Sequence, residues 1–346
     1  MLEREHDQNI ERESVVFKRS QNSEHTNTPF ERVCGGSVDA VFLWVNGTSQ
    51  RHLDLMKQYG RTKVGGLYKD YGTLRFGFRS IVAYAPWIKR IFLVTDGEVP
   101  DYIDEEKGKT TVPQLIIVPH STIIEKEVLP TFNSNTIESY LHKIPTISKC
   151  ILYLNDDMML GRPVKPEFWL GNDGRLNVYH NGFVAPNKEG EKTSIWHRSV
   201  STSNKLVSDK YGNGNTLQHP YPSHHCYFML TDTLNFMENT WKDNYTAARQ
   251  NKFRKANDIV ISFLHAAVTV EENKGEYVKQ RRNFYFNWWT GNHTQNSYTM
   301  NHIAKKENYC VCLNDDIADA TNADREIEFL YKEYSKVLPD PCPFEK

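Results

Sequence analysis

Hydrophobic residues in the first half of the chain occur in short, nearly continuous runs, and each run ends at polar residues. This pattern is typical of strands buried on both faces of a sheet. The runs predict four strands, at 38–45, 89–95, 113–119 and 150–160.

Helical spacing appears between these runs. Leu74, Phe78, Ile81 and Val82 recur at intervals of three and four, which predicts a helix over 73–88. A second helix is predicted within Leu129–Pro145, with Ser134 or Asn135 as its N-cap and Pro145 as its stop. Strands that alternate with helices predict an α/β fold with a largely parallel, doubly wound sheet.

The second half of the chain is less regular. Residues 176–186 predict a further strand, and the Ser- and Asn-rich stretch 189–216 predicts an irregular excursion. Helices are predicted at 231–245, 256–270 and 324–339. The last of these is amphipathic.

Composition limits the class of protein. The chain has 346 residues, and its net charge of −1 argues against a nucleic-acid partner bound through a broad basic face. We expect residues 1–32 to be a mobile polar tail and residues 33–346 to form a single catalytic domain. No apolar run is long enough to span a bilayer, and the tail lacks the apolar stretch of a signal peptide.

The six cysteines do not predict a disulfide scaffold, so we expect free or singly paired thiols. Three N-glycosylation sequons, at Asn46, Asn244 and Asn292, would matter only in a secretory lumen. The cellular compartment therefore stays open.

Polar residues mark the ends of the four predicted strands, where ligands of such sheets bind. The tips are Asn46-Gly47, Asp96-Gly97, His120 and Asp156-Asp157. Two adjacent carboxylates in an apolar segment are costly to bury unless they are paired. They suit Mg²⁺ or Mn²⁺, which prefer oxygen ligands, and the alternative is an Asx-turn or a helix cap.

A second Asn-Asp-Asp sequence contains Asp315 and follows another short apolar run. It predicts either an N-cap for the terminal helix or a further metal or phosphate ligand. Among His219, His224 and His225, one is a candidate proton acceptor near neutral pH.

Basic residues offer two interpretations. The cluster Arg249, Lys252, Arg254 and Lys255 predicts either phosphate binding or a solvated basic face, and the Arg75–Arg79 pair allows the same alternatives. Motifs of P-loop kinases, dinucleotide dehydrogenases, serine hydrolases and zincin proteases do not occur in the sequence.

Taken together, these residues resemble the Stealth family of sugar-1-phosphotransferases. The resemblance covers four blocks in order. "DAVFLWVNGT" resembles the first, and the segments from "LRFGFRSIVAYAPWI" to "LYLNDDMMLGRPV" resemble the second. "QHPYP" to "FRKANDIVISF" is similar to the third, and "CLNDDIADATNADREIEF" resembles the fourth.

The resemblance implies a Rossmann-type, glycosyltransferase-A-like core that uses a UDP-sugar donor and a divalent cation, Mg²⁺ or Mn²⁺. It implies transfer of a sugar-1-phosphate to a glycan or glycoprotein acceptor, with release of UMP. Within the family, GlcNAc-1-phosphate is the most expected group to be transferred. The compartment would be the cytoplasm, near the membrane, for a bacterial capsule-type enzyme and the Golgi lumen for a eukaryotic one.

The resemblance also assigns roles. It implies Asp156, Asp157 and Asp315 as metal ligands, and His219, Arg254 and Asp157 as catalytic residues, with His224 as the alternative histidine. The expected nucleotide-sugar residues are Asn46, Gly47, Arg75, Asp96 and Gly97. The expected acceptor or supporting residues are Asn133, Ser134, Glu138 and His142, with Glu138 and His142 one helical turn apart on one face. A conventional glycosyltransferase that releases UDP and an inactive sugar-nucleotide or glycan-binding module are the alternative functions.

Overall fold

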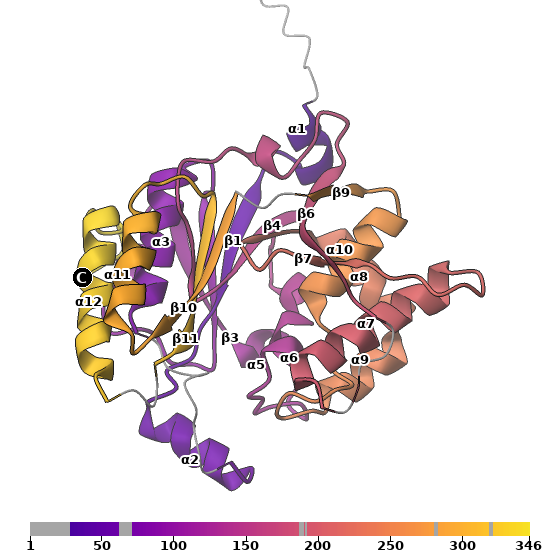
Figure 1. The fold of residues 1–346 in the computed structure, drawn as a ribbon, viewed down its shortest axis with the longest axis horizontal. Helices are drawn as coiled ribbons and strands as arrows, with labels where there is room; N and C mark the ends of the chain where they lie inside the picture. The colour runs from indigo at the N-terminus through magenta and orange to yellow at the C-terminus, as the bar shows by residue number, and fades with distance from the viewer. Residues whose placement is uncertain (1–27, 62–70, 187–189, 191, 280–282, 318–320) are drawn as a thin grey trace, which may run out of the picture.

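A five-stranded sheet with the order β3-β2-β1-β4-β8 lies at the centre of the computed structural model (Figure 1). The structure describes residues 28–61, 71–186, 190, 192–279, 283–317 and 321–346. The strands are β1 (Val38–Leu43), β2 (Arg90–Thr95), β3 (Gln114–Pro119), β4 (Cys150–Asn155) and β8 (Tyr227–Leu230). The first four run parallel, and β8 is antiparallel to β4. The predicted α/β fold with a largely parallel sheet is confirmed.

The described residues form two further three-stranded sheets, with the orders β10-β11-β5 and β7-β6-β9. Their strands are β5 (Met158–Leu160), β6 (Leu176–Val184), β7 (Pro220–Pro222), β9 (Gly275–Lys279), β10 (Phe284–Thr290) and β11 (Cys310–Asp316). β5 begins directly after the Asp156-Asp157 turn and pairs with β11, so that Met158 is the partner of Cys312. This pairing brings the two Asn-Asp-Asp sequences, far apart along the chain, close together.

Helices cover the central sheet on both faces. In Figure 1, α3 (Thr73–Tyr84), α11 (His293–Ile303) and α12 (Ala323–Val337) lie on one side. The opposite side carries α5 (His120–Ile123), α6 (Ser134–Glu138), α7 (Ile195–Tyr211), α8 (Thr231–Thr240), α9 (Lys242–Arg249) and α10 (Ile261–Glu271). The remaining described helices are α1 (Pro29–Cys34), α2 (Gln50–Gln58), α4 (Glu105–Gly108), and the 3₁₀ turns Leu141–Lys143 and Pro166–Phe168. Alternate side chains of β1 enter two different hydrophobic cores, which explains why its run of residues is nearly continuous.

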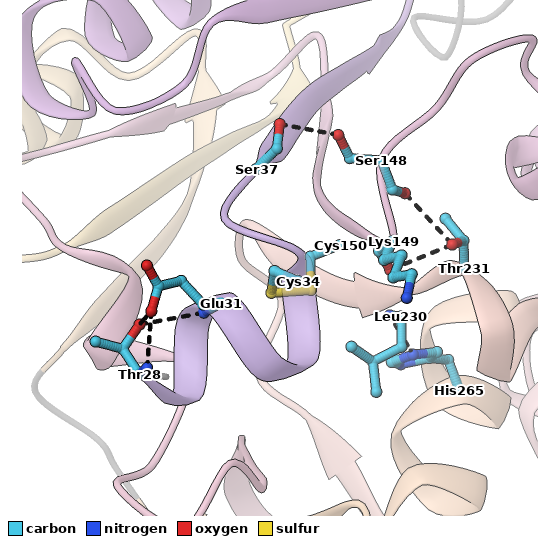
Figure 2. The surroundings of a disulfide bond; sticks show 10 residues. All are labelled: Thr28, Glu31, Cys34, Ser37, Ser148, Lys149, Cys150, Leu230, Thr231 and His265. Atoms are coloured by element: carbon cyan, nitrogen blue, oxygen red, sulfur yellow. Dashed lines mark hydrogen bonds between the residues drawn. A yellow bond between two sulfur atoms is a disulfide. The ribbon is translucent and has the colours of Figure 1, made fainter. Parts of the chain in front are cut away.

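The first helix is fastened to the sheet by a disulfide. Cys34 at the end of α1 is bonded to Cys150 at the start of β4 (Figure 2). The expected tail of residues 1–32 therefore overlaps α1, which begins at Pro29, whereas residues 1–27 of that prediction lie outside the described part of the chain. Of the other cysteines, Cys226, Cys310, Cys312 and Cys342 are free and buried.

Two predicted elements differ from the structure. The N-cap of α6 is Asn133, whose side chain accepts from the amide of Asn135, and the helix already ends at Glu138. Glu138 and His142 are therefore not on one face of one helix. The expected irregular excursion contains α7, a helix of 17 residues.

The second Asn-Asp-Asp sequence ends a strand and does not cap the terminal helix. Its residues form the last part of β11, and the N-cap of α12 is Asn322. Of the two interpretations of Asp315, the structure excludes the helix cap.

Candidate active site

A cavity of about 1680 Å³ opens at the carboxyl ends of the central strands. Trp44 and Val45, which directly follow β1, line the cavity, and the turn after β4 contributes Asp156 and Asp157. The cavity brings together seven residues that the sequence nominated: Asp96, Ser134, Glu138, Asp156, Asp157, Arg254 and Asp315. Ligands of open α/β sheets bind at this end of the strands.

Asp157 occupies the turn between β4 and β5. Its backbone carbonyl accepts a hydrogen bond from the amide of Leu313 at 3.1 Å, which locks the turn to β11. Oδ2 accepts from the thiol of Cys312 at 3.4 Å, and Oδ1 is buried with no hydrogen-bond partner among the described residues. Burial raises the pKa of Asp157, while the neighbouring His224 acts in the opposite direction. An unpaired buried carboxylate oxygen is costly unless a ligand completes it.

Asp315 reaches the same cavity from the end of β11. Oδ1 accepts from the amide of Ile317 at 2.9 Å, and Oδ2 is buried. Burial and the nearby Asp315 carboxylate raise the pKa of the Tyr71 hydroxyl, which also faces the cavity.

The donor set fits a hard divalent cation. Asp156, Asp157 and Asp315 supply carboxylate oxygens to one cavity, and such oxygens are the ligands that Mg²⁺ and Mn²⁺ prefer. The buried, unpaired Oδ1 of Asp157 is the observation that most directly indicates a missing partner.

The structure separates the two candidate histidines. His224 lines the cavity, and its Nδ1 lies 3.0 Å from the hydroxyl of Tyr227. His219 is buried outside the cavity, where Nδ1 lies 2.8 Å from Asn204 and Nε2 lies 3.0 Å from Glu271. Burial lowers the pKa of His224, although Asp157 opposes the shift. A neutral imidazole is the form that accepts a proton.

Arg254 contributes a cation to the cavity, and Glu138 contributes a titratable carboxyl group. Arg254 donates from Nη2 to the hydroxyl of Ser134 at 2.7 Å and carries an exposed guanidinium. Burial raises the pKa of Glu138 to about 7, although the charge of Arg254 favours its ionised form. Glu138 therefore titrates in the neutral range.

A second cluster of polar side chains surrounds Asp96 at the tip of β2. Arg51 Nη1 lies 3.1 Å from its carboxylate and His52 Nδ1 lies 3.6 Å from it. Burial opposes ionisation of Asp96, but the hydrogen bond from His52 and the charge of Arg51 outweigh it and lower the pKa. Burial lowers the pKa of the adjacent His120 to about 4. The sequence prediction missed Arg51 and His52. Their position in α2, the helix that follows the tip of β1, was the signal that could have identified them.

The other residues that the sequence predicted for the site do not line the cavity in the described structure. They are Asn46, Gly47, Arg75, Gly97, Asn133, His142 and His219. Arg75 lies instead beside the carboxylate of Glu345, at 3.6 Å. The ring of His142 contacts Glu238 at 2.6 Å, and the amide of Asn133 donates to Asp258 at 2.8 Å.

The loop residues have local roles. The side chain of Asn46 accepts hydrogen bonds from the amide and hydroxyl of Thr48, and Gly97 adopts a positive φ of 108° in the turn after β2. Such a φ favours glycine because it has no Cβ.

Exposed aromatic residues form a wall of the cavity that the sequence prediction missed. They are Phe183, Trp196, Phe286 and Trp288. Trp196 stacks on Tyr221 at 5.8 Å between ring centroids, and Phe286 contacts the ring of His224 at 5.4 Å. For Phe286 and Trp288, the sequence signal was the recurrence of aromatic residues at every second position of β10, which places them with Phe284 on one face of the strand.

An acid-lined cavity at the carboxyl ends of a largely parallel sheet is the place where α/β proteins of this kind bind their ligands. Two conserved regions of the Stealth family match this chain. Residues 67–178 match the model of "Stealth protein CR2, conserved region 2", and residues 223–271 match "Stealth protein CR3, conserved region 3". The second match includes His224 and Arg254, whereas His219 precedes it.

Curated relatives include bacterial phosphotransferases. An exopolysaccharide phosphotransferase of Lactiplantibacillus plantarum is 25% identical over 93% of this chain and 98% of its own. A capsular polysaccharide phosphotransferase of Haemophilus influenzae is 26% identical, covering 88% and 84%. An exopolysaccharide phosphotransferase of Streptomyces coelicolor is 26% identical over 89% of this chain, which spans about half the length (52%) of that relative.

Solved structures give a more distant likeness. The galactosyltransferase LgtC, solved with donor and acceptor sugar analogues, has a TM-score of 0.34 and 11% identity, covering 85% of this chain and 95% of its own. The WbbM bifunctional glycosyltransferase has a TM-score of 0.38 and 9% identity, covering 88% and 50%. Because both TM-scores are low, the assignment of the α/β fold is based on the strand order of the central sheet. Within the described ranges, no helix has the length and apolar character needed to cross a membrane.

Proposed function

We propose that this protein transfers a sugar-1-phosphate, most simply GlcNAc-1-phosphate, from a UDP-sugar to a hydroxyl of a glycan or glycoprotein and releases UMP. The observation that supports the proposal most strongly is the convergence of Asp157, His224 and Arg254 in one cavity. The matches to two conserved regions of the Stealth family and the names of the relatives agree with it.

The reaction exchanges one phosphorus–oxygen bond for another. The acceptor hydroxyl oxygen attacks the phosphorus that carries the sugar, the bond from that phosphorus to the bridging oxygen breaks, and UMP leaves with that oxygen. His224 takes the hydroxyl proton, because its lowered pKa keeps the ring neutral at pH 7. This assignment replaces His219, whose ring nitrogens are engaged by Asn204 and Glu271 outside the cavity.

Arg254 stabilises the negative charge on the transferred phosphoryl group. Its guanidinium is exposed in the cavity and is held at Nη2 by Ser134, which leaves its other N–H groups for phosphate oxygens. Burial raises the pKa of Glu138 and the positive charge of Arg254 opposes that shift, so the two groups attract each other, and this attraction helps to orient the guanidinium. Asp156, Asp157 and Asp315 would hold a divalent cation, which when bound supplies positive charge to the diphosphate.

The two ends of the substrate occupy different parts of the cavity. The uridine part of the donor lies toward Asp96, Arg51 and His52 at the tip of β2, where hydrogen-bonding groups are gathered. The sugar rings lie toward the wall of Phe183, Trp196, Phe286 and Trp288, since aromatic faces pack well against the apolar faces of sugars.

The released nucleotide tests the reaction. The protein is incubated with UDP-GlcNAc, Mg²⁺ or Mn²⁺ and a panel of simple glycans, with Asp157→Asn as the matched control. UMP together with a phosphodiester product is the expected result. UDP would replace the proposal with a conventional glycosyltransferase, and tight UDP-GlcNAc binding with no turnover across the panel would favour a binding module.

A further inference from the structure

Three side chains from distant parts of the sequence bring a carboxylate, an imidazole and a thiol together at the inner end of the cavity. They are Asp157 in the turn between β4 and β5, His224 in the loop between β7 and β8, and Cys312 in β11. One ligand atom from each lies within 4.8 Å of the others. Oxygen, nitrogen and sulfur in one cluster differ from the carboxylate set that suits Mg²⁺.

We propose that Asp157, His224 and Cys312 form a binding site for a thiophilic divalent cation, most simply Zn²⁺. Zinc is bound by carboxylate, imidazole and thiolate ligands, and three protein ligands with an open fourth position are typical of reactive zinc sites. A tetrahedral zinc ion separates its ligand atoms by roughly 3.3–3.8 Å. Sγ of Cys312 already lies 3.4 Å from Oδ2 of Asp157, and ligand atoms of the three residues lie within 4.8 Å of one another.

The surroundings of the cluster favour a metal over a simple hydrogen-bonded core. Oδ1 of Asp157 is buried and has no hydrogen-bond partner among the described residues. Within the part of the chain that the structure describes, the Cys312 thiol makes two weak contacts, at 3.4 Å from Asp157 Oδ2 and 3.4 Å from Asn314 Oδ1. The Tyr227 hydroxyl holds Nδ1 of His224 at 3.0 Å, the kind of support that orients histidine ligands.

Binding of the divalent cation releases one proton from the protein. The Cys312 thiol releases its proton to the buffer and becomes a thiolate, and Asp157 and neutral His224 bind without further change. The open position faces the cavity, because Asp157 and His224 line it.

Cobalt(II) makes the site visible. The protein is titrated anaerobically with Co²⁺ alone, and thiolate ligation is detected as a near-ultraviolet charge-transfer band. We expect one equivalent of Co²⁺ to produce the band and Zn²⁺ to abolish it by displacement. The absence of a charge-transfer band in the wild-type protein would overturn the proposal.

The strand itself offers a matched control. Cys310 is buried two residues before Cys312 on β11, so Cys310→Ser changes an equivalent thiol without touching the cluster. Cys312→Ser should lose the band and bind Co²⁺ at least tenfold more weakly, whereas Cys310→Ser should keep both. A band that survives in Cys312→Ser, or disappears in Cys310→Ser, would place the cation elsewhere. Circular dichroism and melting temperature confirm that both variants are folded.

The titration contains no sugar nucleotide, so its result is independent of the proposed transferase activity. If that activity is present, zinc would occupy Asp157 and His224 and inhibit it. Cys312→Ser should then raise the Zn²⁺ concentration needed for half-inhibition at least tenfold, with the Mg²⁺ concentration held constant.

Discussion

Arg254 is tied to the first residue of α6 by a 2.7 Å hydrogen bond from Nη2 to the hydroxyl of Ser134. The same short helix ends at Glu138, which also lines the cavity. α6 therefore positions the cation and a titrating carboxyl together. Asn133 caps the N-terminus of α6, and its side-chain amide donates to Asp258, which fixes the position of the helix.

Replacing Arg254 by alanine should remove the charge that stabilises the transferred phosphoryl group. We expect kcat/KM to fall by about 10²–10³-fold, as on loss of one donor to a developing anion. Ser134→Ala should cost much less, because the guanidinium keeps its charge. Lys255→Ala is the control: this neighbouring exposed cation does not line the described cavity. Initial rates of UMP release test the set, and equal losses in Arg254→Ala and Lys255→Ala would point to a general basic surface.

The two histidines should separate catalysis from stability. His224→Ala should lower kcat by about 10²–10⁴-fold, as expected on loss of a general base. His219→Ala should instead lower the free energy of unfolding by about 1–3 kcal/mol, because it removes the buried imidazole that contacts Asn204 and Glu271.

Urea denaturation and initial rates, measured on both variants, decide between the histidines. A His219→Ala protein that is fully stable but inactive would return the proton-acceptor role to His219.

Glu138→Gln should change how stability depends on pH. The folded-state pKa of Glu138 is about 7 and its ordinary value is 4.5, so the folded state retains the proton across this interval. The stabilising contribution is present below pH 4.5 and is lost as the pH rises through 7. At pH 8 the buried charge costs roughly 3 kcal/mol, from the size of the shift.

We therefore expect Glu138→Gln to be more stable than the wild-type protein at pH 8 and nearly equal to it at pH 4.5. Denaturant midpoints between pH 4.5 and pH 8 test this. Glu328→Gln, on α12 and outside the residues that line the cavity, is the matched control and should leave the pH dependence unchanged. A constant difference across the pH range would mean that Glu138 is ionised throughout.

The strands and their polar tips could be predicted from the sequence because burial on both faces leaves an unambiguous apolar run. β1 is buried along its whole length, and even Asp39 within it is neutralised by Arg90 at 2.7 Å. The carboxylates at the ends of β4 and β11 were identifiable for the same reason. The pairing of β5 with β11, which joins them in one site, is a long-range contact that no local pattern encodes.

The differences between the sequence predictions and the structure have physical causes. The Ser-rich stretch was assigned to a loop because serine competes for backbone hydrogen bonds, but in α7 the hydroxyls of Ser199 and Ser203 bond back to carbonyls one turn earlier. The spacing of His219 and His224 could not show which ring faces the cavity. That choice depends on packing around β7 and β8, where Asn204 and Glu271 hold His219 away from the cavity.

Loss of the Cys34–Cys150 disulfide should destabilise the protein without touching the cavity. The bond joins residues 116 positions apart and fastens α1 to the first residue of β4 (Figure 2). Cross-linking so long a segment restricts the unfolded chain strongly, and its removal should cost about 2–5 kcal/mol. Reductant should therefore lower the denaturant midpoint of the wild-type protein.

Cys34→Ser should start at the lower midpoint and show no further response to reductant. Cys342→Ser, which removes a free buried thiol at the far end of the chain, should respond to reductant as the wild-type protein does. Because the cavity is lined by neither cysteine of the disulfide, UMP release by the fraction that remains folded should be unchanged. A wild-type midpoint that is insensitive to reductant, although free-thiol titration shows that the bond is reduced, would mean that packing alone holds α1 against the sheet.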